Sequence, residues 1–593
     1  MRLMIALLLL LSLACQSRAG ELPDFAKVKL PGVIHTAVGV TRRGTPIDAF
    51  VSPEDGDFRT KKFRILLVGG LDGDRQSVDA VLDALQRFQT DENTAAYRKT
   101  ILISAIPCAN PDGVLLGNGE ENATGAKVGL GYPPGGRFYQ SETNVEAQYL
   151  WRWIGMHAPD LVVDVRRGDR LLWQVPYSIQ EKWVGEFAFR KDFRPVGDSD
   201  DIKDSLVTAL NHPGVDVSGR IPALRLSLGD TSASTALARL LAKHTEGWFA
   251  QSEANRRLRK RQDFSLQTVA RLLPHLAQQK PRSQGYVDTL HVAALARLIH
   301  SVNGDNLREA LPESRADELA AVMRLHPVKS GSDMAGRLMY VELARHAPPD
   351  NRESYLMYAR EAADLAFDDR DEPLPHPPFH NQMSDAIFMS GPLLAGVGKL
   401  TGDKRYFDAC TTQTAFMRKL CLRKDGLYRR SPQCEEAWGR GNGFAAMGMA
   451  MMLADLPETH PQRAALSAAL TSHLQALCGH QDPSGMWRQV IDRPESYQEF
   501  TCTCMIAFAL RYASHERLVQ PDPFAAPFLR AADAIQRRIM EDGRLVDVCT
   551  GTGKQNSLRA YYDREAILGH DARGGAMALM FFSQWWSERR QRE

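Results

Sequence analysis

The sequence predicts a multidomain protein in which an α/β domain precedes an all-helical one. Two observations carry this prediction. Short apolar runs alternate with helical patterns in the first half, and from about Ser265 onward only helical patterns follow. The chain has 593 residues, which is too long for one hydrophobic core. The expected boundaries are 20–245 for the first domain, 246–264 for a linker and 265–593 for the second domain.

Residues 1–19 have the composition of a secretory signal peptide. Arg2 is followed by an apolar run that is too short to span a bilayer, and then by small residues that end at Ala19. We expect cleavage after Ala19. As an alternative, Ser12–Cys15 resembles a lipoprotein box, which would place a lipid anchor on Cys15. Either way we expect a periplasmic or secreted protein, and no later stretch is apolar enough for a membrane span.

Composition excludes several classes of partner and site. The formal net charge is +2, which gives no reason to expect nucleic acid or an anionic membrane as partner. The cysteines form no C-x-x-C pair, so neither a zinc ribbon nor a thioredoxin-type redox site is indicated. We expect most of them to be small buried hydrophobic residues.

The first half reads as strands separated by helices. Apolar runs at 63–68, 101–106 and 161–165 predict buried strands, and helical spacing predicts helices at 78–88 and 145–156. Short apolar strands that alternate with helices are typical of a mostly parallel sheet covered by helices.

The second half carries helical stripes at 292–299, 335–344, 445–453 and 464–477. Three of its loops repeat one theme, with Gly426, Gly485 and Gly543 about 58 residues apart. That spacing accommodates two helices and their turns, so we expect five or six helix pairs that close into an (α/α)6 toroid of inner and outer helices. The alternative is an irregular helical domain.

The charged segment Asn255–Asp263 lies between the two halves. It is a candidate nucleic-acid patch, but a solvated helix or linker next to the domain boundary is the interpretation we prefer.

Two carboxylates stand at the start of helical runs in the second half. Asp385 precedes the apolar run 386–389, and Asp333 lies in Ser332–Arg337. Each has a structural interpretation as a helix-capping residue and a functional one as a group that gives and takes protons at the mouth of a ring.

Clusters of aromatic and polar side chains also interrupt the helical stripes of the second half. Trp438 and Arg440 belong to a glycine-rich segment, and Trp487 with Gln489 repeats the pattern. Trp offers a face for a sugar ring and Arg a fork for a carboxylate. Together these side chains predict a site for an anionic sugar.

Four segments of the second half carry a family resemblance: Gln382–Leu394, Gly426–Gly443, Gly485–Asp492 and Gly569–Ala576. In this order they resemble the unsaturated rhamnogalacturonyl hydrolases of glycoside hydrolase family 105, which are related to the unsaturated glucuronyl hydrolases of family 88. The resemblance runs from about Asp333 to the end of the sequence. It implies a six-hairpin glycosidase fold, in agreement with the repeat.

The resemblance also implies a reaction, hydration of the C4=C5 double bond that a lyase leaves on a terminal uronic acid. Asp385 matches the catalytic aspartate and Asp333 a supporting one, while Trp438 and Arg440 match the substrate pocket. Arg430 departs from the family, which commonly has a His there. This change would retune or weaken the activity. The resemblance implies no metal or cofactor.

Segments of the first half, Leu67–Arg75, Ile106–Gly113 and His157–Asp164, resemble the zinc carboxypeptidases. The resemblance covers roughly residues 30–240 and implies a mixed α/β sheet. The residues that would bind zinc are missing, since the matching positions hold Asp72, Arg75 and Arg166. The catalytic Glu is replaced by Ser227. Catalytic zinc needs three N, O or S ligands, so we expect a pseudopeptidase without metal.

Four arginines of the first half, Arg75, Arg137, Arg166 and Arg167, are candidates for an anion site near the former metal pocket. The alternative, which we prefer, is that they form ordinary salt bridges. For the whole chain we expect an exported hydrolase of unsaturated uronyl oligosaccharides. Its alternatives are a zinc metallocarboxypeptidase and a non-catalytic carbohydrate-binding protein.

Overall fold

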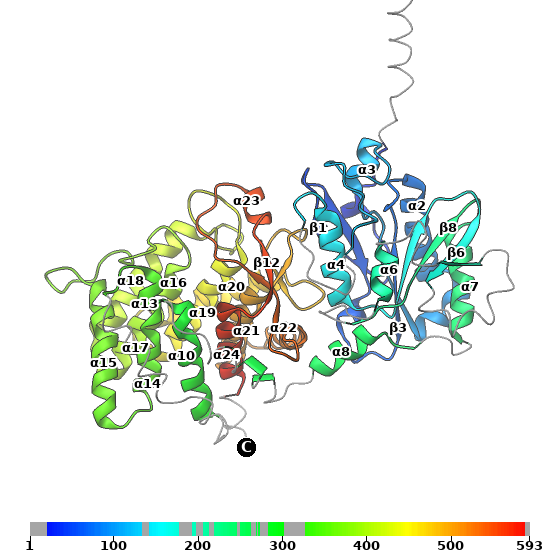
Figure 1. Cartoon of the computed structure of the whole chain (residues 1–593). Coiled ribbons are helices and arrows are strands. Elements are labelled where there is room, and N and C mark those ends of the chain that lie inside the picture. Colours follow the sequence, from blue (N-terminus) through cyan, green and yellow to red (C-terminus); the bar gives the residue numbers. More distant parts are fainter. Residues whose placement is uncertain are drawn as a thin grey trace, which may run out of the picture. The chain divides into compact units, whose positions relative to one another are not determined.

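The computed structural model describes residues 20–132, 141–176, 193–196, 205–212, 219–245, 250–262, 268–269, 271–272, 275, 283–301 and 327–586 (Figure 1). The predicted signal peptide and Arg137 lie outside these residues. The described residues form two compact units, one within residues 1–260 and one within 261–593, with Pro494–Ser496 grouped with the first.

The first unit is built on one eight-stranded sheet. In spatial order its strands are β1 (Ile34–Val40), β2 (Pro46–Val51), β4 (Ile101–Ile106), β3 (Phe63–Val68), β5 (Leu161–Arg166), β8 (Ala223–Leu228), β6 (Leu171–Pro176) and β7 (Phe193–Val196). The central strands β4, β3, β5 and β8 run parallel, while β2 and β6 join them antiparallel. The predicted parallel core is confirmed, and the sheet as a whole is mixed.

Helices cover this sheet because its central strands are apolar on both faces. Every residue of β3, β4 and β5 is buried. Helix α2 (Arg75–Thr90) starts where Asp74 caps its first turn, and it packs with α7 (Ala233–Thr245). Helix α4 (Val145–His157) packs on β1 instead, and α6 (Leu206–Asn211) packs on β6 and β8. Helix α3 (Pro111–Leu116) follows β4.

Most of the segment that we predicted as a linker forms helix α8 (Glu253–Gln262). Ala254 and Leu258 on this helix are buried, and the Arg259 guanidinium donates hydrogen bonds to the carbonyls of Phe58 and Thr60. At least one charged residue of this helix, Arg259, is therefore held by hydrogen bonds and is not simply solvated. The exact boundaries of the two domains stay a prediction.

Six helices of the second unit form a closed ring in the part of the chain that the structure describes. They are α10 (Tyr286–Ser301), α14 (Leu338–Ala344), α17 (Gly391–Thr401), α19 (Gly439–Asp455), α21 (Phe500–His515) and α24 (Ala572–Trp586). Each packs against the next, and α24 packs against α10. The predicted toroid is therefore confirmed.

Outer helices connect the inner ones. They are α15 (Pro349–Ala363), α18 (Lys404–Cys421), α20 (Arg463–Cys478) and α22 (Ala525–Arg537). Short helices α13 (Gly331–Gly336), α16 (Ala386–Met389) and α23 (Leu558–Tyr562) lie in the connections. The 3-10 turns of the two units are 25–27, 53–56, 92–94, 97–99 and 364–366.

The three glycines of the sequence repeat occupy equivalent turns. Gly426, Gly485 and Gly543 have φ angles of +85°, +91° and +82°, a left-handed conformation that favours glycine. Each turn is closed by the same pair of backbone hydrogen bonds. A fourth copy places Asp371 in this position with φ +63°. The sequence pattern missed this copy because it lacks the glycine.

Two expectations for the second unit were wrong in detail. Strands do occur there, as the two-stranded sheets β9 (Trp487–Arg488) with β10 (Gln498–Glu499) and β11 (Leu545–Cys549) with β12 (Ala566–Gly569). The stripe 335–344 is split at Arg337 into α13 and α14. These sheets lie in connections, where short pairings leave no long alternating pattern in the sequence.

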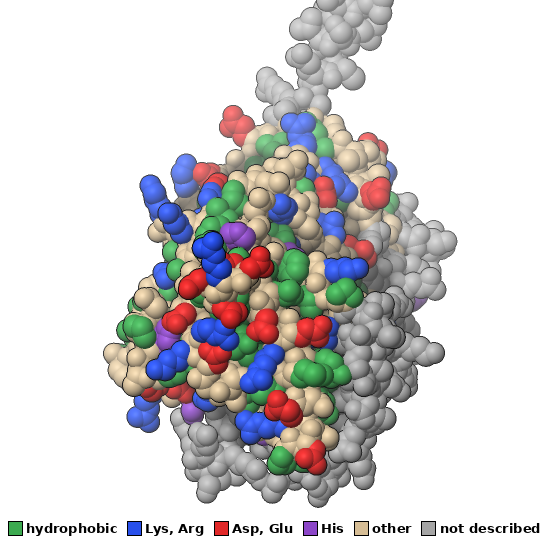
Figure 2. All heavy atoms as spheres, turned by 90° about the vertical axis from the view of Figure 1, so that its left-hand side faces the viewer, with side chains coloured by type: hydrophobic (Ala, Val, Ile, Leu, Met, Phe, Trp, Pro, Cys, Tyr) green, Lys and Arg blue, Asp and Glu red, His purple; other side chains and the backbone are tan. Residues whose placement is uncertain are grey.

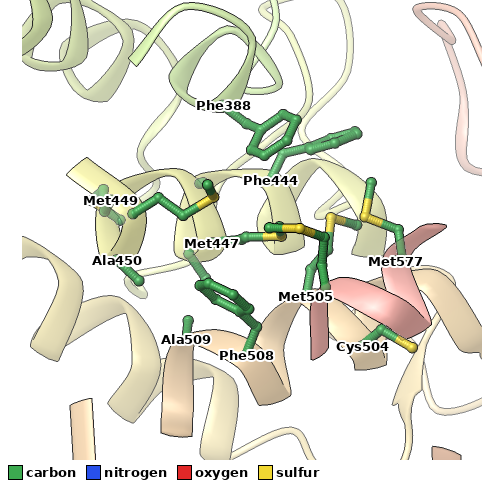
Figure 3. Close-up of a cluster of buried hydrophobic side chains, with 14 of the residues drawn as sticks. Phe388, Phe444, Met447, Met449, Ala450, Cys504, Met505, Phe508, Ala509 and Met577 are labelled. Atoms are coloured by element: carbon green, nitrogen blue, oxygen red, sulfur yellow. The ribbon is translucent and has the colours of Figure 1, made fainter. Parts of the chain in front are cut away.

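The centre of the ring is filled by side chains from several inner helices. Figure 3 shows methionines and phenylalanines from α16, α19, α21 and α24 in contact, among them Met447, Met505 and Met577. Methionine is unbranched and fills irregular gaps between converging helices. The ring is thus a packed core, and a site is expected at its end.

Candidate active site

Polar side chains gather where the inner helices begin. The segments before α16, α19 and α21 are joined by backbone hydrogen bonds, from Ser384 N to Arg430 O at 2.9 Å and from Gly439 N to Gln489 O at 2.7 Å. Arg440 donates to the carbonyls of Cys549 and Thr550, which lie at the end of β11. The starts of successive helices therefore meet at one end of the ring, and their positive dipole ends favour an anionic ligand there.

Asp385 and Arg430 form a buried ion pair at this end. The Asp385 Oδ2 to Arg430 Nη2 distance is 3.2 Å, and the two side chains are 7% and 4% exposed. Asp385 stands at the start of α16, but its side chain makes no capping hydrogen bond there. The capping interpretation of Asp385 is therefore not supported by its contacts.

The indole ring of Trp438 lies under two guanidinium groups. The Arg430 Cζ atom lies 3.8 Å from the ring centroid and that of Arg440 4.7 Å. Trp438 is buried, and its ring stacks with that of Tyr561 at 6.5 Å between centroids. Trp438 thus holds the Arg430 guanidinium beside Asp385, and its ring also contacts the Arg440 guanidinium.

Several buried polar atoms here have no hydrogen-bond partner among the residues that the structure describes. They are Asp385 Oδ1, Arg430 Nε and Nη1, Trp438 Nε1, Gln489 Oε1, Ser384 Oγ and His380 Nδ1. Buried polar groups in folded proteins are almost always paired, so a local concentration of unpaired ones marks a place where a polar ligand completes the structure. The donors and acceptors are the kind that a sugar with hydroxyl and carboxylate groups requires.

Asp333 lies in the first turn of α13. Its carboxylate accepts a hydrogen bond from the Lys329 backbone N–H at 3.1 Å, so the capping interpretation applies to it. Burial lowers the pKa of His380 below its ordinary value, and Arg430 adds to this, while the carboxylates of Asp385 and Asp333 oppose it. The charges of both predicted aspartates thus influence the pKa of His380.

Gln489 and Trp487 have different environments. The Gln489 side-chain amide donates to the Tyr561 carbonyl, which places it beside the Trp438 cluster. Trp487 is fully buried in the helical core, and its indole N–H donates to the Leu477 carbonyl at 2.7 Å. Its contacts are those of a core residue, and its predicted role in substrate binding stays a prediction.

Sequence reasoning missed Ser384, His380, Tyr561 and Lys554. Gly441 packs so closely on Ser384 that an added Cβ would come within 2.8 Å of its hydroxyl. Burial raises the pKa of Tyr561 above its ordinary value, so its hydroxyl stays protonated at neutral pH. Lys554 donates to the Gln382 side chain at 2.9 Å. The position of Ser384 next to Asp385 was the one available signal.

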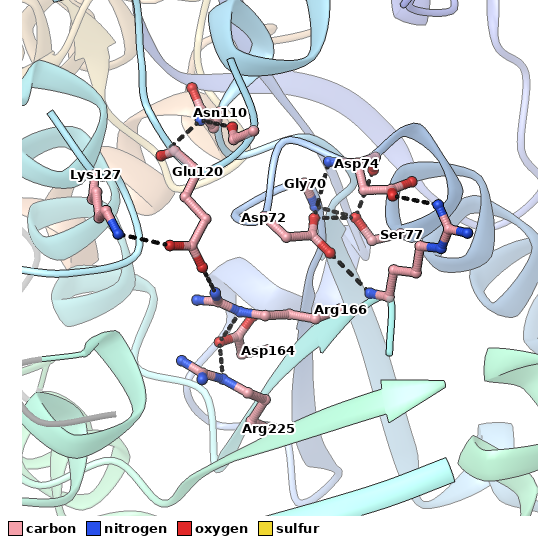
Figure 4. A network of polar contacts seen from close by, with 12 residues as sticks. Gly70, Asp72, Asp74, Ser77, Asn110, Glu120, Lys127, Asp164, Arg166 and Arg225 are labelled. Atoms are coloured by element: carbon pink, nitrogen blue, oxygen red, sulfur yellow. Dashed lines mark hydrogen bonds and ion pairs between the residues drawn. The ribbon is translucent and has the colours of Figure 1, made fainter. Parts of the chain in front are cut away.

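In the first unit the described arginines that we considered for an anion site are paired, and Figure 4 shows the contacts of Arg166. Arg166 bonds Asp164 and Glu120, Arg75 bonds Asp79, and Arg167 bonds Asp74. All three described arginines thus form salt bridges.

The donors at this place do not fit a zinc ion. One Asp72 oxygen accepts hydrogen bonds from Ser77 and Asp74, and the other accepts one from the Arg167 backbone N–H at 2.8 Å. Among the described residues, no group of three His, Cys, Asp or Glu side chains is arranged to hold a metal.

Two further features bear on the partners. No helix within the described ranges combines the length and apolar character needed to cross a membrane. On the face seen in Figure 2, acidic and basic side chains intermingle, in keeping with the small net charge. An anionic ligand must therefore be held by local arginines.

Comparisons with known proteins found a matching family and several similar hydrolases. The family model of glycosyl hydrolase family 88 matches residues 275–587. An unsaturated rhamnogalacturonyl hydrolase, YesR of Bacillus subtilis, is 26% identical over 239 residues, which are 37% of this chain and 61% of the relative. An unsaturated 3S-rhamnoglycuronyl hydrolase of an Alteromonas species is 25% identical over 174 residues, 27% of this chain and 42% of the relative. The matches thus span less than two thirds of these relatives.

Solved structures resemble each half separately. A possible member of family GH105 from Salmonella enterica has a TM-score of 0.47 at 20% identity, covering 55% of this chain and 93% of that one. A metallo-carboxypeptidase from Burkholderia cenocepacia has a TM-score of 0.30 at 19% identity, covering 37% of this chain and 66% of that one.

Proposed function

Because the chain belongs to glycosyl hydrolase family 88, we propose that its second unit hydrolyses unsaturated uronyl oligosaccharides during polysaccharide breakdown. The single observation that supports this best is the group of unpartnered buried atoms around Asp385, Arg430 and Trp438. These supply a carboxyl group for proton transfer, a guanidinium for a uronate and an aromatic face for a sugar ring.

In the proposed reaction Asp385 gives a proton to C4 of the unsaturated sugar. Water then adds at C5, and its proton returns to the Asp385 carboxylate. The resulting C5 hemiketal opens to a ketone, which leaves a hemiacetal at C1 that releases the neighbouring sugar. Arg430 Nε and Nη1 hold the uronate carboxylate, while Trp438 keeps this guanidinium in place. No nucleophilic carboxylate is needed.

The test is the loss of ultraviolet absorbance when the purified protein meets lyase-generated unsaturated disaccharides from rhamnogalacturonan, ulvan and glycosaminoglycans. Asp385→Asn should slow the reaction by about 10²-fold or more, since general acid–base catalysis contributes that much. Asp542→Asn, which changes a carboxylate in an exposed turn of the same unit, is the matched control. Undiminished activity of Asp385→Asn would refute the assignment. Activity on none of the sugars would favour a non-catalytic carbohydrate-binding protein.

For the first unit we propose a pseudopeptidase. The positions expected to bind zinc hold Asp72, Arg75 and Arg166, and the contacts of these side chains support the proposal. The zinc metallocarboxypeptidase alternative requires stoichiometric zinc and peptide cleavage. Metal analysis of the purified chain together with a peptide hydrolysis assay decides between the two.

We further propose that the protein is exported to the periplasm or secreted. The proposal is supported by the composition of residues 1–19, with cleavage after Ala19 or a lipid on Cys15. The intact mass of the mature protein separates these outcomes, and an unprocessed N-terminus would contradict both.

A further inference from the structure

The carboxyl ends of β3, β5 and β8 in the first unit bring together polar groups that the proposed function does not use. The chain leaves β3 for β4 on one side and later returns to β5 on the other, so the strand order reverses between β3 and β5. In open α/β sheets, ligands bind at such a switch point, outside the carboxyl ends of the strands. Asp72 follows β3, and Arg166 is the last residue of β5.

One carboxylate binds two arginines that lie on the neighbouring strands β5 and β8. The sheet register pairs Asp164 with Arg225 and Arg166 with Ser227. Arg166 Nε lies 3.0 Å from both Asp164 oxygens, and Arg225 Nε lies 3.1 Å from Asp164 Oδ2. In Figure 4 the two guanidinium groups flank the Asp164 carboxylate. Asp164 therefore fixes the orientation of both.

Each guanidinium keeps one unused amino group. Arg166 Nη2 and Arg225 Nη2 are buried and have no hydrogen-bond partner within the described ranges, and the two residues are only 7% and 8% exposed. Arg166 Nη1 is taken by Glu120 at 3.0 Å. Leaving a buried donor without a partner lowers stability, and more so when the donor is charged. Two such donors on neighbouring strands indicate a built site.

The local charges select the kind of ligand. Asp164 neutralises one of the two guanidinium groups, and Glu120 is matched by Lys127 at 3.5 Å. The Asp72 carboxylate accepts hydrogen bonds from Ser77 and from the Arg167 backbone N–H. The two arginines and Asp164 together carry about one positive charge, which suits a monoanion better than a dianion. Arginine amino groups match the two oxygens of a carboxylate.

We propose that Arg166 and Arg225 form a binding site for a small carboxylate at the switch point of the first unit. The carboxylate comes from a uronic-acid sugar or from a simple organic acid. In either case the two free Nη2 groups donate to its oxygens. The first unit then contributes ligand binding rather than peptide cleavage.

The test measures binding of D-galacturonate, acetate, phosphate and neutral D-galactose to the full chain by ligand-observed NMR. The wild type should bind the two carboxylates and not galactose. Arg225→Gln should weaken carboxylate binding at least tenfold, and it leaves Asp164 paired with Arg166. Arg167→Gln is the control, because this exposed arginine pairs with Asp74 outside the site.

A second variant keeps the test valid if Arg225→Gln does not fold. Ser227→Asp keeps both arginines but places a competing carboxylate beside Arg166, so it should also abolish binding. Acetate binding by the wild type would favour a simple acid, and binding of galacturonate alone would favour a uronate sugar. Unchanged carboxylate binding in both variants, or phosphate bound more tightly than carboxylate, would overturn the proposal.

Discussion

The Asp385–Arg430 pair predicts a measurable coupling between two residues of the candidate active site. Removing one partner of a buried ion pair costs about 3–5 kcal/mol, because the other charge is left buried alone. Arg430→Met also removes the cation–π contact with Trp438 at 3.8 Å, worth about 1–2 kcal/mol when desolvated. We therefore expect about 4–7 kcal/mol of destabilisation for Arg430→Met and about 3–5 kcal/mol for Asp385→Asn.

The double variant has no buried charge left unpaired, so its cost should fall about 3 kcal/mol short of the sum of the single costs. The assay is calorimetric unfolding of the full chain at neutral pH, with the four proteins compared as a double-mutant cycle. Arg559→Met with Asp563→Asn, an exposed pair in the same unit, should show a coupling below about 1 kcal/mol. Additive costs for the buried pair, within about 0.5 kcal/mol, would refute the reasoning.

Three further predictions follow from the geometry. Gly441→Ala should lower activity on unsaturated disaccharides by more than about tenfold in the fully folded protein, since its Cβ would displace Ser384 beside Asp385. Gly553→Ala, where a Cβ meets nothing within 4 Å, should not, and equal losses would contradict this account. Trp438→Phe keeps a ring but loses the unpaired indole N–H, so the KM should rise several-fold with little change in kcat if that donor binds substrate. Burial alone would raise the pKa of Asp164, but its two arginine partners hold it below the ordinary 3.8. Stability from this charge is therefore present above pH 3.8 and lost as the pH falls through the depressed pKa, and Asp164→Asn should flatten that acid loss of thermal stability.

Much of the fold was predictable because it depends on local patterns. The runs 63–68 and 101–106 became strands with these bounds, since a short, continuously apolar segment is stable only inside a covered sheet. The glycine repeat predicted the helical ring because each left-handed turn needs a residue without a side-chain penalty. The sequence pattern did not predict the turn at Asp371, because there an aspartate rather than a glycine adopts the left-handed conformation.

The candidate site was only partly predictable. Sequence indicated Asp385, Trp438 and Arg430 as members, but not that Arg430 pairs with Asp385 above the Trp438 ring. It did not indicate His380, because nothing in the sequence shows which side chains converge when separate helices begin at the same end of a ring.

By itself, the sequence determined the two kinds of architecture and the residue types available for chemistry, because apolar spacing and turn residues act over a few neighbours in the chain. Only the tertiary structure decided which polar groups stay unpaired. Arg166 and Arg225 lie far apart in the sequence, and strand register alone brings them to the same carboxylate. Burial and partner choice depend on these long-range contacts, so the site at Asp385 and the arginine pair on β5 and β8 became visible only in the folded chain.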